Sequence, residues 1–136
     1  MSQPSLFDEM GGETMLGMVV DRFIDRVFAD AMIGFFFAGA DRKRIKEKEY
    51  ELAAVTLGAP IRYTGRPVAE AHRRHPIQTG HFARRLEILR QTLADFQVPP
   101  QVMQHWLQHN AQLQSVVVRG DDAACGPGSG SDEGAA

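Results

Sequence analysis

Apolar residues recur at helical spacing in every long segment of the chain, and this periodicity most limits the fold. The clearest stripe lies in residues 13–29, at positions i, i+3, i+4, i+7 and i+11: Leu16, Val19, Val20, Phe23 and Val27. That spacing places the five side chains on one face of a helix. No segment alternates apolar and polar residues as a half-buried strand does. The sequence therefore predicts an all-α fold of about six helices.

Glycine, aspartate and aromatic residues mark helix ends in the first half of the chain. Residues 4–10 are expected to form a short helix, and Gly11-Gly12 breaks it because glycine turns without steric cost. Three consecutive aromatics at 35–37 cannot share one helical face, so we expect a corner there. They either wall a cavity or fill the core. Asp41 is expected to cap a helix of residues 41–57.

The inner face of residues 41–57 holds a carboxylate where an apolar side chain is expected. Its line at helical spacing consists of Ile45, Glu49, Leu52 and Thr56. Lys48 shares a turn with this line. An ionisable pair beside an apolar stripe indicates a polar pocket. The alternative is a helix whose lysine and glutamate side chains are solvated.

Prolines organise the stretch that follows. Residues 58–65 are expected to form a loop, and Pro67 fits the first position of a short helix. That helix ends near Arg74, because Pro76 disfavours helical geometry in the residue before it. His72 then lies in its final turn. A turn at residues 78–80 follows.

Two further amphipathic helices complete the predicted fold. The first starts near His81, and its apolar stripe consists of Phe82, Leu86, Leu89 and Leu93. Three arginines of this helix are expected to point largely outward: Arg84, Arg85 and Arg90. The second runs from Val98-Pro99-Pro100 to about Val118. Its apolar and polar lines are Val102, Trp106, Leu113 and Val117, and Gln101, His105, Gln108 and Gln112.

Composition limits the class of protein. The chain has 136 residues and a net charge of −2, and the four acids of the last 18 residues leave residues 1–118 nearly neutral. A neutral body excludes general binding to nucleic acid, which needs clustered basic charge. No apolar run is long enough to span a membrane, and no signal peptide is visible. One cysteine, Cys125, forms no internal disulfide, so we expect a cytoplasmic protein.

The chain is expected to divide into a folded domain, residues 1–118, and a disordered acidic tail rich in glycine and serine, residues 119–136. Other chemistry has weak support. His105 and His109 have the i, i+4 spacing of metal ligands, but they lie among glutamines and are expected to be solvated. A zinc site could be formed by Glu70 with His72, His75 and His81, but the spacing of these residues matches no strong zinc signature. Nucleophilic serine or cysteine catalysis has no support.

A set of short motifs, in one order, resembles the truncated haemoglobins and most closely their group I. The matching residues span roughly 5–118. They are Leu6-Phe7 before Gly11-Gly12, Val20-Asp21-Arg22-Phe23, Arg26-Val27, Ala29-Asp30, Phe36-Phe37, Leu57-Gly58, Tyr63-Thr64-Gly65-Arg66, Ala71-His72, His81-Phe82 and Val98-Pro99. Each dipeptide alone is a weak signal, but the ordered set is specific. The resemblance implies a truncated globin, a two-over-two helical sandwich that encloses haem b.

The resemblance also implies roles for particular residues. His72 corresponds to the proximal iron ligand, whereas His81 corresponds to a histidine that does not bind the iron. Phe37 resembles the aromatic that packs on the haem face. Arg44 and Arg66 lie where basic side chains meet haem propionates. The other residues expected at the cofactor are Ile45, Lys48, Glu49, Leu52, Phe82 and Leu86.

The distal side departs from the family pattern. Ile24 stands where group I members commonly have a tyrosine, and Ile45 and Glu49 stand where they often have glutamine. The resemblance therefore does not by itself predict high-affinity dioxygen binding or efficient nitric oxide dioxygenation. Three states of Lys48 remain open. It ligates the iron as sixth ligand, it stays charged and pairs with Glu49 or a propionate, or it is free in solvent.

We therefore expect a monomer or weak dimer that binds dioxygen, nitric oxide or carbon monoxide at the iron. A redox or nitric oxide dioxygenase activity would require a reductase as partner. The rival interpretation is a haem-free helical interaction domain that keeps the globin fold. Glu49 favours that rival slightly, because a carboxylate buried near haem needs a partner.

Overall fold

The computed structural model describes residues 5–65 and 79–113, and all regular structure in these residues is helical. The helices are α1 (Leu6–Glu9), α2 (Gly12–Ala29), the short 3₁₀ helix η1 (Gly34–Phe37), α3 (Arg42–Thr56), α5 (Thr79–Asp95) and α6 (Pro100–Gln112). The predicted helix at 67–74, the end of the last helix and the tail lie outside the described residues. None of the described helices is long and apolar enough to cross a membrane.

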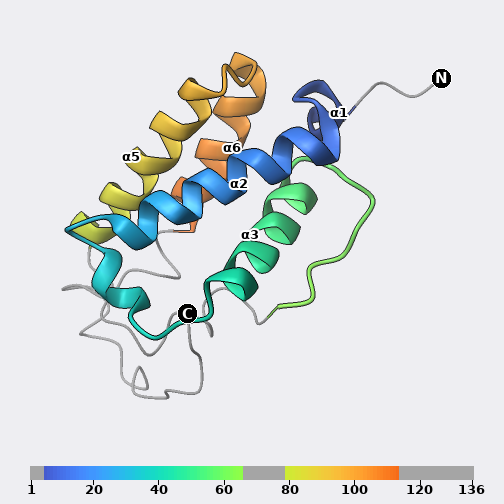
Figure 1. The fold of residues 1–136 in the computed structure, drawn as a ribbon. Helices are drawn as coiled ribbons and strands as arrows, with labels where there is room; N and C mark the ends of the chain where they lie inside the picture. Colours follow the sequence, from blue (N-terminus) through green and yellow to red (C-terminus); the bar gives the residue numbers. More distant parts are fainter. Residues whose placement is uncertain (1–4, 66–78, 114–136) are drawn as a thin grey trace, which may run out of the picture.

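Two pairs of helices stack on each other. α2 packs against both α3 and α5, α5 packs against α6, and α6 also contacts α3. In Figure 1, α2 runs across the molecule, and α3 returns toward α1 beneath it. The backbone N–H of Phe7 donates to the carbonyl oxygen of Leu57 over 2.9 Å, which ties the end of α3 to α1. The result is the two-over-two sandwich that the sequence predicted.

The core forms around α2. All five residues of its predicted stripe are buried, and Ile24 joins them. They meet buried residues from the other three long helices: Ala53, Ala54, Leu89, Leu93, Val102 and Trp106. Burying a side chain of this size stabilises the fold by about 1.5–3 kcal/mol. Helix α2 therefore provides the surface on which the other helices assemble.

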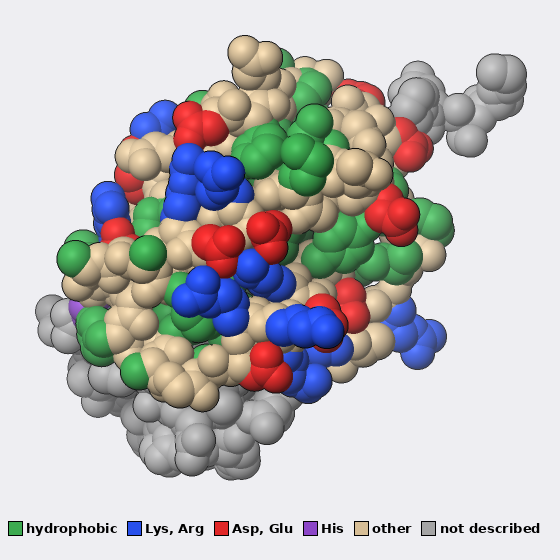
Figure 2. Space-filling view, in the orientation of Figure 1, with side chains coloured by type: hydrophobic (Ala, Val, Ile, Leu, Met, Phe, Trp, Pro, Cys, Tyr) green, Lys and Arg blue, Asp and Glu red, His purple; other side chains and the backbone are tan. Residues whose placement is uncertain are grey.

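Charged side chains cover the seam between α2 and α3. Lys46 of α3 contacts Asp21 over 2.7 Å and Asp25 over 2.9 Å, and Arg42 contacts Asp25 over 3.1 Å. Acidic and basic groups meet over this seam on the face that Figure 2 shows. Hydrogen bonds from Lys46 and Arg42 hold the pKa of the Asp25 carboxyl below its usual value.

The helix ends follow local chemistry. The Ser5 hydroxyl and the Asp8 carboxylate form a capping box at α1. Gly11 has φ of 117°, so the predicted break before α2 uses a left-handed conformation that favours glycine. Asp41 caps α3 as predicted, because its side chain accepts from the backbone N–H of Arg44 over 3.2 Å. Helix α5 includes Thr79 and Gly80, so the prediction that these two residues belong to a turn is wrong.

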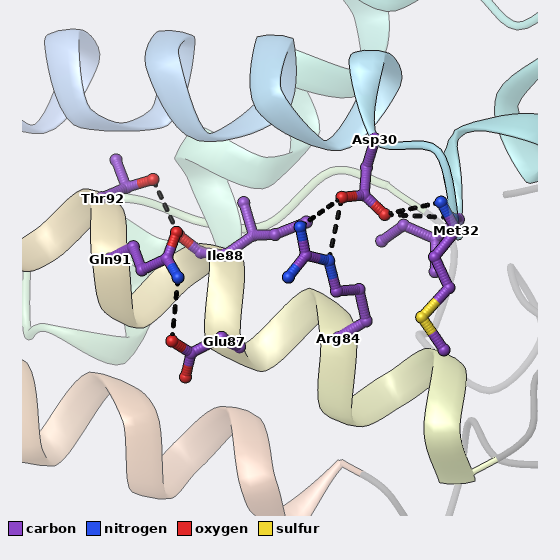
Figure 3. Close-up of polar contacts among 8 residues, drawn as sticks. Asp30, Met32, Arg84, Glu87, Ile88, Gln91 and Thr92 are labelled. Atoms are coloured by element: carbon purple, nitrogen blue, oxygen red, sulfur yellow. Dashed lines mark hydrogen bonds and ion pairs between the residues drawn. The ribbon is translucent and has the colours of Figure 1, made fainter.

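The predicted corner after α2 is centred on Asp30. One carboxylate oxygen accepts from the backbone N–H groups of Met32 (3.0 Å) and Ile33 (3.1 Å). The other accepts from Nε (2.9 Å) and Nη2 (2.7 Å) of Arg84, on α5. Figure 3 shows Asp30 between the turn and Arg84. Arg84 was predicted to point largely outward. Its side chain is 40 % exposed, but its guanidinium binds the Asp30 carboxylate, which is only 6 % exposed.

The three aromatics of the corner divide between core and surface. Phe36 is buried, Phe37 is half-buried and stacks on Phe28 at 5.1 Å between ring centroids, and Phe35 is exposed. A Cβ atom on Gly34 would lie 2.6 Å from the Phe28 carbonyl oxygen, so the corner approaches α2 too closely for a side chain there. Phe36 thus fills the core, as one of the two alternatives proposed.

Replacing Asp30→Asn should lower the free energy of unfolding by about 1–2 kcal/mol at neutral pH, because charge-assisted hydrogen bonds are lost. Arg84 and the turn amides hold the pKa of Asp30 below its usual 3.8. Its contribution is therefore present above pH 3.8 and disappears as pH falls through the lower pKa of the folded state.

Urea unfolding at several pH values measures this. The difference between wild type and variant should shrink in acid. Asp95→Asn, at an exposed pair with Arg26, is the control and should change stability less. If the free energies of unfolding of wild type and Asp30→Asn differed by the same amount at neutral and acid pH, the stabilising role assigned to the ionised Asp30 carboxylate would be contradicted.

Candidate functional site

The inner face of α3 is half-buried and mixed in character. Ile45, Glu49, Leu52 and Thr56 are all intermediate in exposure, as expected of one line at helical spacing. Its end is held by α6, where a ring nitrogen of His105 lies 3.0 Å from the Thr56 carbonyl oxygen. A ring nitrogen of His109 lies 3.4 Å from the Thr56 hydroxyl. Both histidines therefore contact the backbone or side chain of α3.

Glu49 is paired with an arginine of α5. Its Oε1 lies 3.1 Å from Nη2 of Arg85, and the Glu49 side chain is only 12 % exposed. Nη1 of Arg85 donates to Oδ1 of Asn110 on α6 over 2.8 Å. Asn110 is buried, and its amide donates to the Trp106 carbonyl oxygen over 3.0 Å. A polar chain thus joins α3, α5 and α6, and we call these three side chains the Glu49–Arg85–Asn110 chain.

Arg85 is the residue that sequence reasoning missed. It was predicted to point outward with Arg84 and Arg90, and that prediction is wrong for Arg85. Its guanidinium carbon lies 5.0 Å from the centroid of the Phe23 ring, over the stripe of α2. Arg90 does point outward and is about half exposed. The available signal was charge: an inward carboxylate on one helix requires a cation on a facing one.

Lys48 has a different carboxylate partner from the one predicted. Its Nζ donates to the Thr64 hydroxyl over 2.5 Å and lies 3.6 Å from Oε2 of Glu51. Glu51 also accepts from the Thr64 backbone N–H over 2.7 Å and from its hydroxyl over 2.8 Å. The Thr64 backbone N–H is the main cause that holds the pKa of Glu51 below its usual value. Lys48 therefore contacts Glu51, which is three residues further along the same helix, whereas Glu49 contacts Arg85.

The remaining predicted residues lie on both sides of this arrangement. Phe82 is buried at the start of α5, and Leu86 is half-buried one turn later. Phe37 is half-buried at the corner, and Arg44 is exposed near the start of α3. His72 and Arg66 lie outside the described residues.

His81 packs on an aromatic of the corner. Its ring meets that of Phe36 edge-on, with 4.9 Å between centroids. In the described parts of the chain, no three histidine, cysteine or acidic side chains gather as a metal site. The zinc site that includes His72 and His75 falls outside the residues tested.

A depression of about 460 Å³ opens between α2 and α3, bordered by Asp21, Lys43, Lys46, Tyr50 and Ile61 among others. These α3 positions are displaced by about half a helical turn from Ile45, Glu49 and Leu52. The depression therefore belongs to the opposite face of α3 from the predicted site. Burial raises the pKa of the Tyr50 hydroxyl at this depression.

Glu51→Ala should release the loop that Glu51 holds. The Thr64 backbone N–H loses its acceptor, so its hydrogen exchange should become much faster. Exchange measured residue by residue by NMR tests this, with Glu47→Ala, an exposed carboxylate of the same helix, as the matched control. Equal protection of Thr64 in wild type and Glu51→Ala would refute the contact.

The chain matches the family model described as bacterial-like globin over residues 5–118. It is 33% identical over 117 residues to the group 1 truncated haemoglobin GlbN of Mycolicibacterium paratuberculosis, covering 86% of each chain. It is 29% identical over 101 residues to the group 1 truncated haemoglobin of Tetrahymena thermophila, covering 74% of this chain and 84% of that one.

Solved structures agree on the fold. The Fe(III) form of the truncated haemoglobin of Tetrahymena pyriformis superposes with a TM-score of 0.80 at 24% identity, covering 86% of this chain and 100% of that one. The structure of Chlamydomonas reinhardtii THB1 gives a TM-score of 0.73 at 26% identity, covering 86% of this chain and 98% of that one. The chain therefore belongs to the bacterial-like globins, as a truncated haemoglobin with the two-over-two fold, a family whose cofactor is haem.

Proposed function

We propose that this globin binds dioxygen, nitric oxide or carbon monoxide at a haem iron that His72 would hold. The observation that carries the proposal is the pairing of Glu49 with Arg85. The one carboxylate on the inner face of α3 is compensated within the protein, so a haem beside that face would meet no unpaired buried charge. The globin family supports the binding of a diatomic ligand in general.

The described residues fit a haem in their chemistry. Ile45 and Leu52 of α3 and Phe82 and Leu86 of α5 supply apolar side chains for the two flat faces. Arg44, exposed near the start of α3, is available to a propionate, as Arg66 would be. Neither His105 nor His109 competes as iron ligand in this structure, because both contact Thr56.

When bound, the haem supplies a reversible binding position for a small ligand at its iron. The chain's own residues do the rest. His72 would provide the imidazole, the apolar side chains would exclude water, and the arginines would hold the propionates. Ile24 is buried in the α2 stripe, where it offers no hydrogen bond to a ligand. The polar groups left on this side are those of the Glu49–Arg85–Asn110 chain.

For Lys48 we propose the charged, paired state. Its contacts with Thr64 and Glu51 support this, because an amine that ligates iron must give up its proton and both partners. The Thr64 hydroxyl would lose the hydrogen bond from Lys48, so ligation by Lys48 would also remove one contact that holds the loop at residues 58–65. Because of these linked losses, we propose that Lys48 would not hold the iron.

The rival, a haem-free interaction domain, loses its supporting observation. Glu49 favoured it only while that carboxylate had no known partner. Arg85 and Asn110 supply the partner and its second anchor within the described residues. The haem-binding proposal is therefore the stronger one.

His72→Gly should lose haem retention, because the imidazole is the main attachment of the iron to the chain. Haem titration followed by absorption measures it, and added imidazole should partly restore the spectrum. His75→Gly is the control and should retain haem. Normal haem binding by His72→Gly would overturn the proximal assignment.

Lys48→Ala should have the same ferric spin state as the wild-type protein at each pH from neutral to alkaline, because Lys48 is not a ligand in the proposed state. Absorption spectra of the ferric protein measure the spin state, and Lys46→Ala is the matched control on the opposite face of α3. A wild-type spectrum that is low-spin at alkaline pH, together with a high-spin Lys48→Ala spectrum, would show that Lys48 ligates the iron.

A further inference from the structure

If haem binds beside α3, as proposed, the Glu49–Arg85–Asn110 chain supplies polar groups on that side of the pocket. Glu49 shares one face of α3 with Ile45 and Leu52, at spacings of four and three residues. Arg85 lies between Phe82 and Leu86 on α5 and reaches across to α3. The pair therefore joins the two helices whose apolar residues would flank the haem.

The guanidinium is held in one orientation. Glu49 and Asn110 each bind a different terminal nitrogen, over 3.1 and 2.8 Å, and the Phe23 ring lies beneath at 5.0 Å. Asn110 is fixed in turn by its bond to the Trp106 carbonyl oxygen. A cation held on three sides needs little reorganisation when an anion binds to it.

Arg85 keeps donors for a further acceptor. A guanidinium has five N–H groups, and its contacts with Glu49 and Asn110 in the described structure use two of them. The side chain is 23 % exposed, so it is neither fully sealed nor freely solvated. Glu49, by contrast, only accepts hydrogen bonds when ionised, and its charge repels an anion.

We propose that Arg85 determines the ligand specificity of the pocket by favouring anionic ligands of the ferric haem, with Glu49 and Asn110 as its positioning residues. The proposal rests on the proposed function, since it requires that haem is bound. The two charges act in opposite directions. Arg85 strengthens anion binding through a charge-assisted hydrogen bond, and Glu49 weakens it while holding Arg85 in place.

Equilibrium titration of the ferric protein with fluoride, followed by absorption, tests the proposal. Arg85→Gln should weaken fluoride binding roughly ten- to hundredfold, the effect of losing one charge-assisted hydrogen bond. Glu49→Gln keeps the shape but removes the negative charge, so it should strengthen fluoride binding. Imidazole, a neutral ligand, should change by a much smaller factor in both variants.

The exposed pair of Arg90 and Glu87 on the same helix supplies charge-matched controls. Arg90→Gln and Glu87→Gln change the net charge by the same amounts as Arg85→Gln and Glu49→Gln, and should leave fluoride binding nearly unchanged. Arg85→Lys retains the positive charge, so it should recover part of the lost affinity. If Arg85→Gln does not fold, the double variant Glu49→Gln with Arg85→Gln takes its place in the titration, because it leaves no unpaired charge.

A second measurement, the stretching frequency of carbon monoxide bound to the ferrous protein, reports the electric field at the ligand directly. A positive charge beside carbon monoxide on ferrous haem lowers its stretching frequency, so Arg85→Gln should raise that frequency and Glu49→Gln should lower it. The role of Arg85 would be overturned if Arg85→Gln changed the affinities for fluoride and imidazole by the same factor. It would also be overturned if Arg85→Gln and Arg90→Gln changed the fluoride affinity equally. A wild-type protein that retains no haem would instead refute the proposed function itself.

Discussion

The buried pair of Glu49 and Arg85 is the interaction on which the arrangement of the site depends. A carboxylate that is 12 % exposed requires a compensating cation, and only a facing helix can bring one to it. Removing one partner of this half-buried pair would leave the other charge poorly solvated and without its counter-charge. The pair therefore fixes how α3 and α5 face each other, and Asn110 extends that constraint to α6.

Other charged groups hold the elements around this pair. Lys48 contacts Glu51 and Thr64, and the contacts of Thr64 fasten the loop after α3. Arg84, the residue before Arg85 on α5, binds Asp30 and closes the corner after α2. Neighbouring arginines on one helix thus bind carboxylates of two different elements. The polar contacts of α5 orient the helix, while its apolar face packs on α2.

The sequence predicted the fold well because helical periodicity and capping are local properties. The α2 stripe and the Asp41 cap both depend on residues within a few positions of each other. Arg85 was misplaced because a pattern of period 3.6 sorts residues by polarity, and a buried ion pair violates that rule on both helices at once. The partner of Lys48 was missed for a related reason, since Thr64 comes from a loop whose path no periodicity specifies. The roles of His72 and Arg66 rest on resemblance and remain predictions.

We expect this truncated globin to hold haem beside a face of α3 whose half-buried carboxylate is already paired. The decisive measurement is the absorption spectrum of the purified wild-type chain together with its haem content. A red protein with a Soret band and about one haem per chain is expected if one histidine holds the iron. A colourless chain that stays colourless after incubation with haem would contradict it.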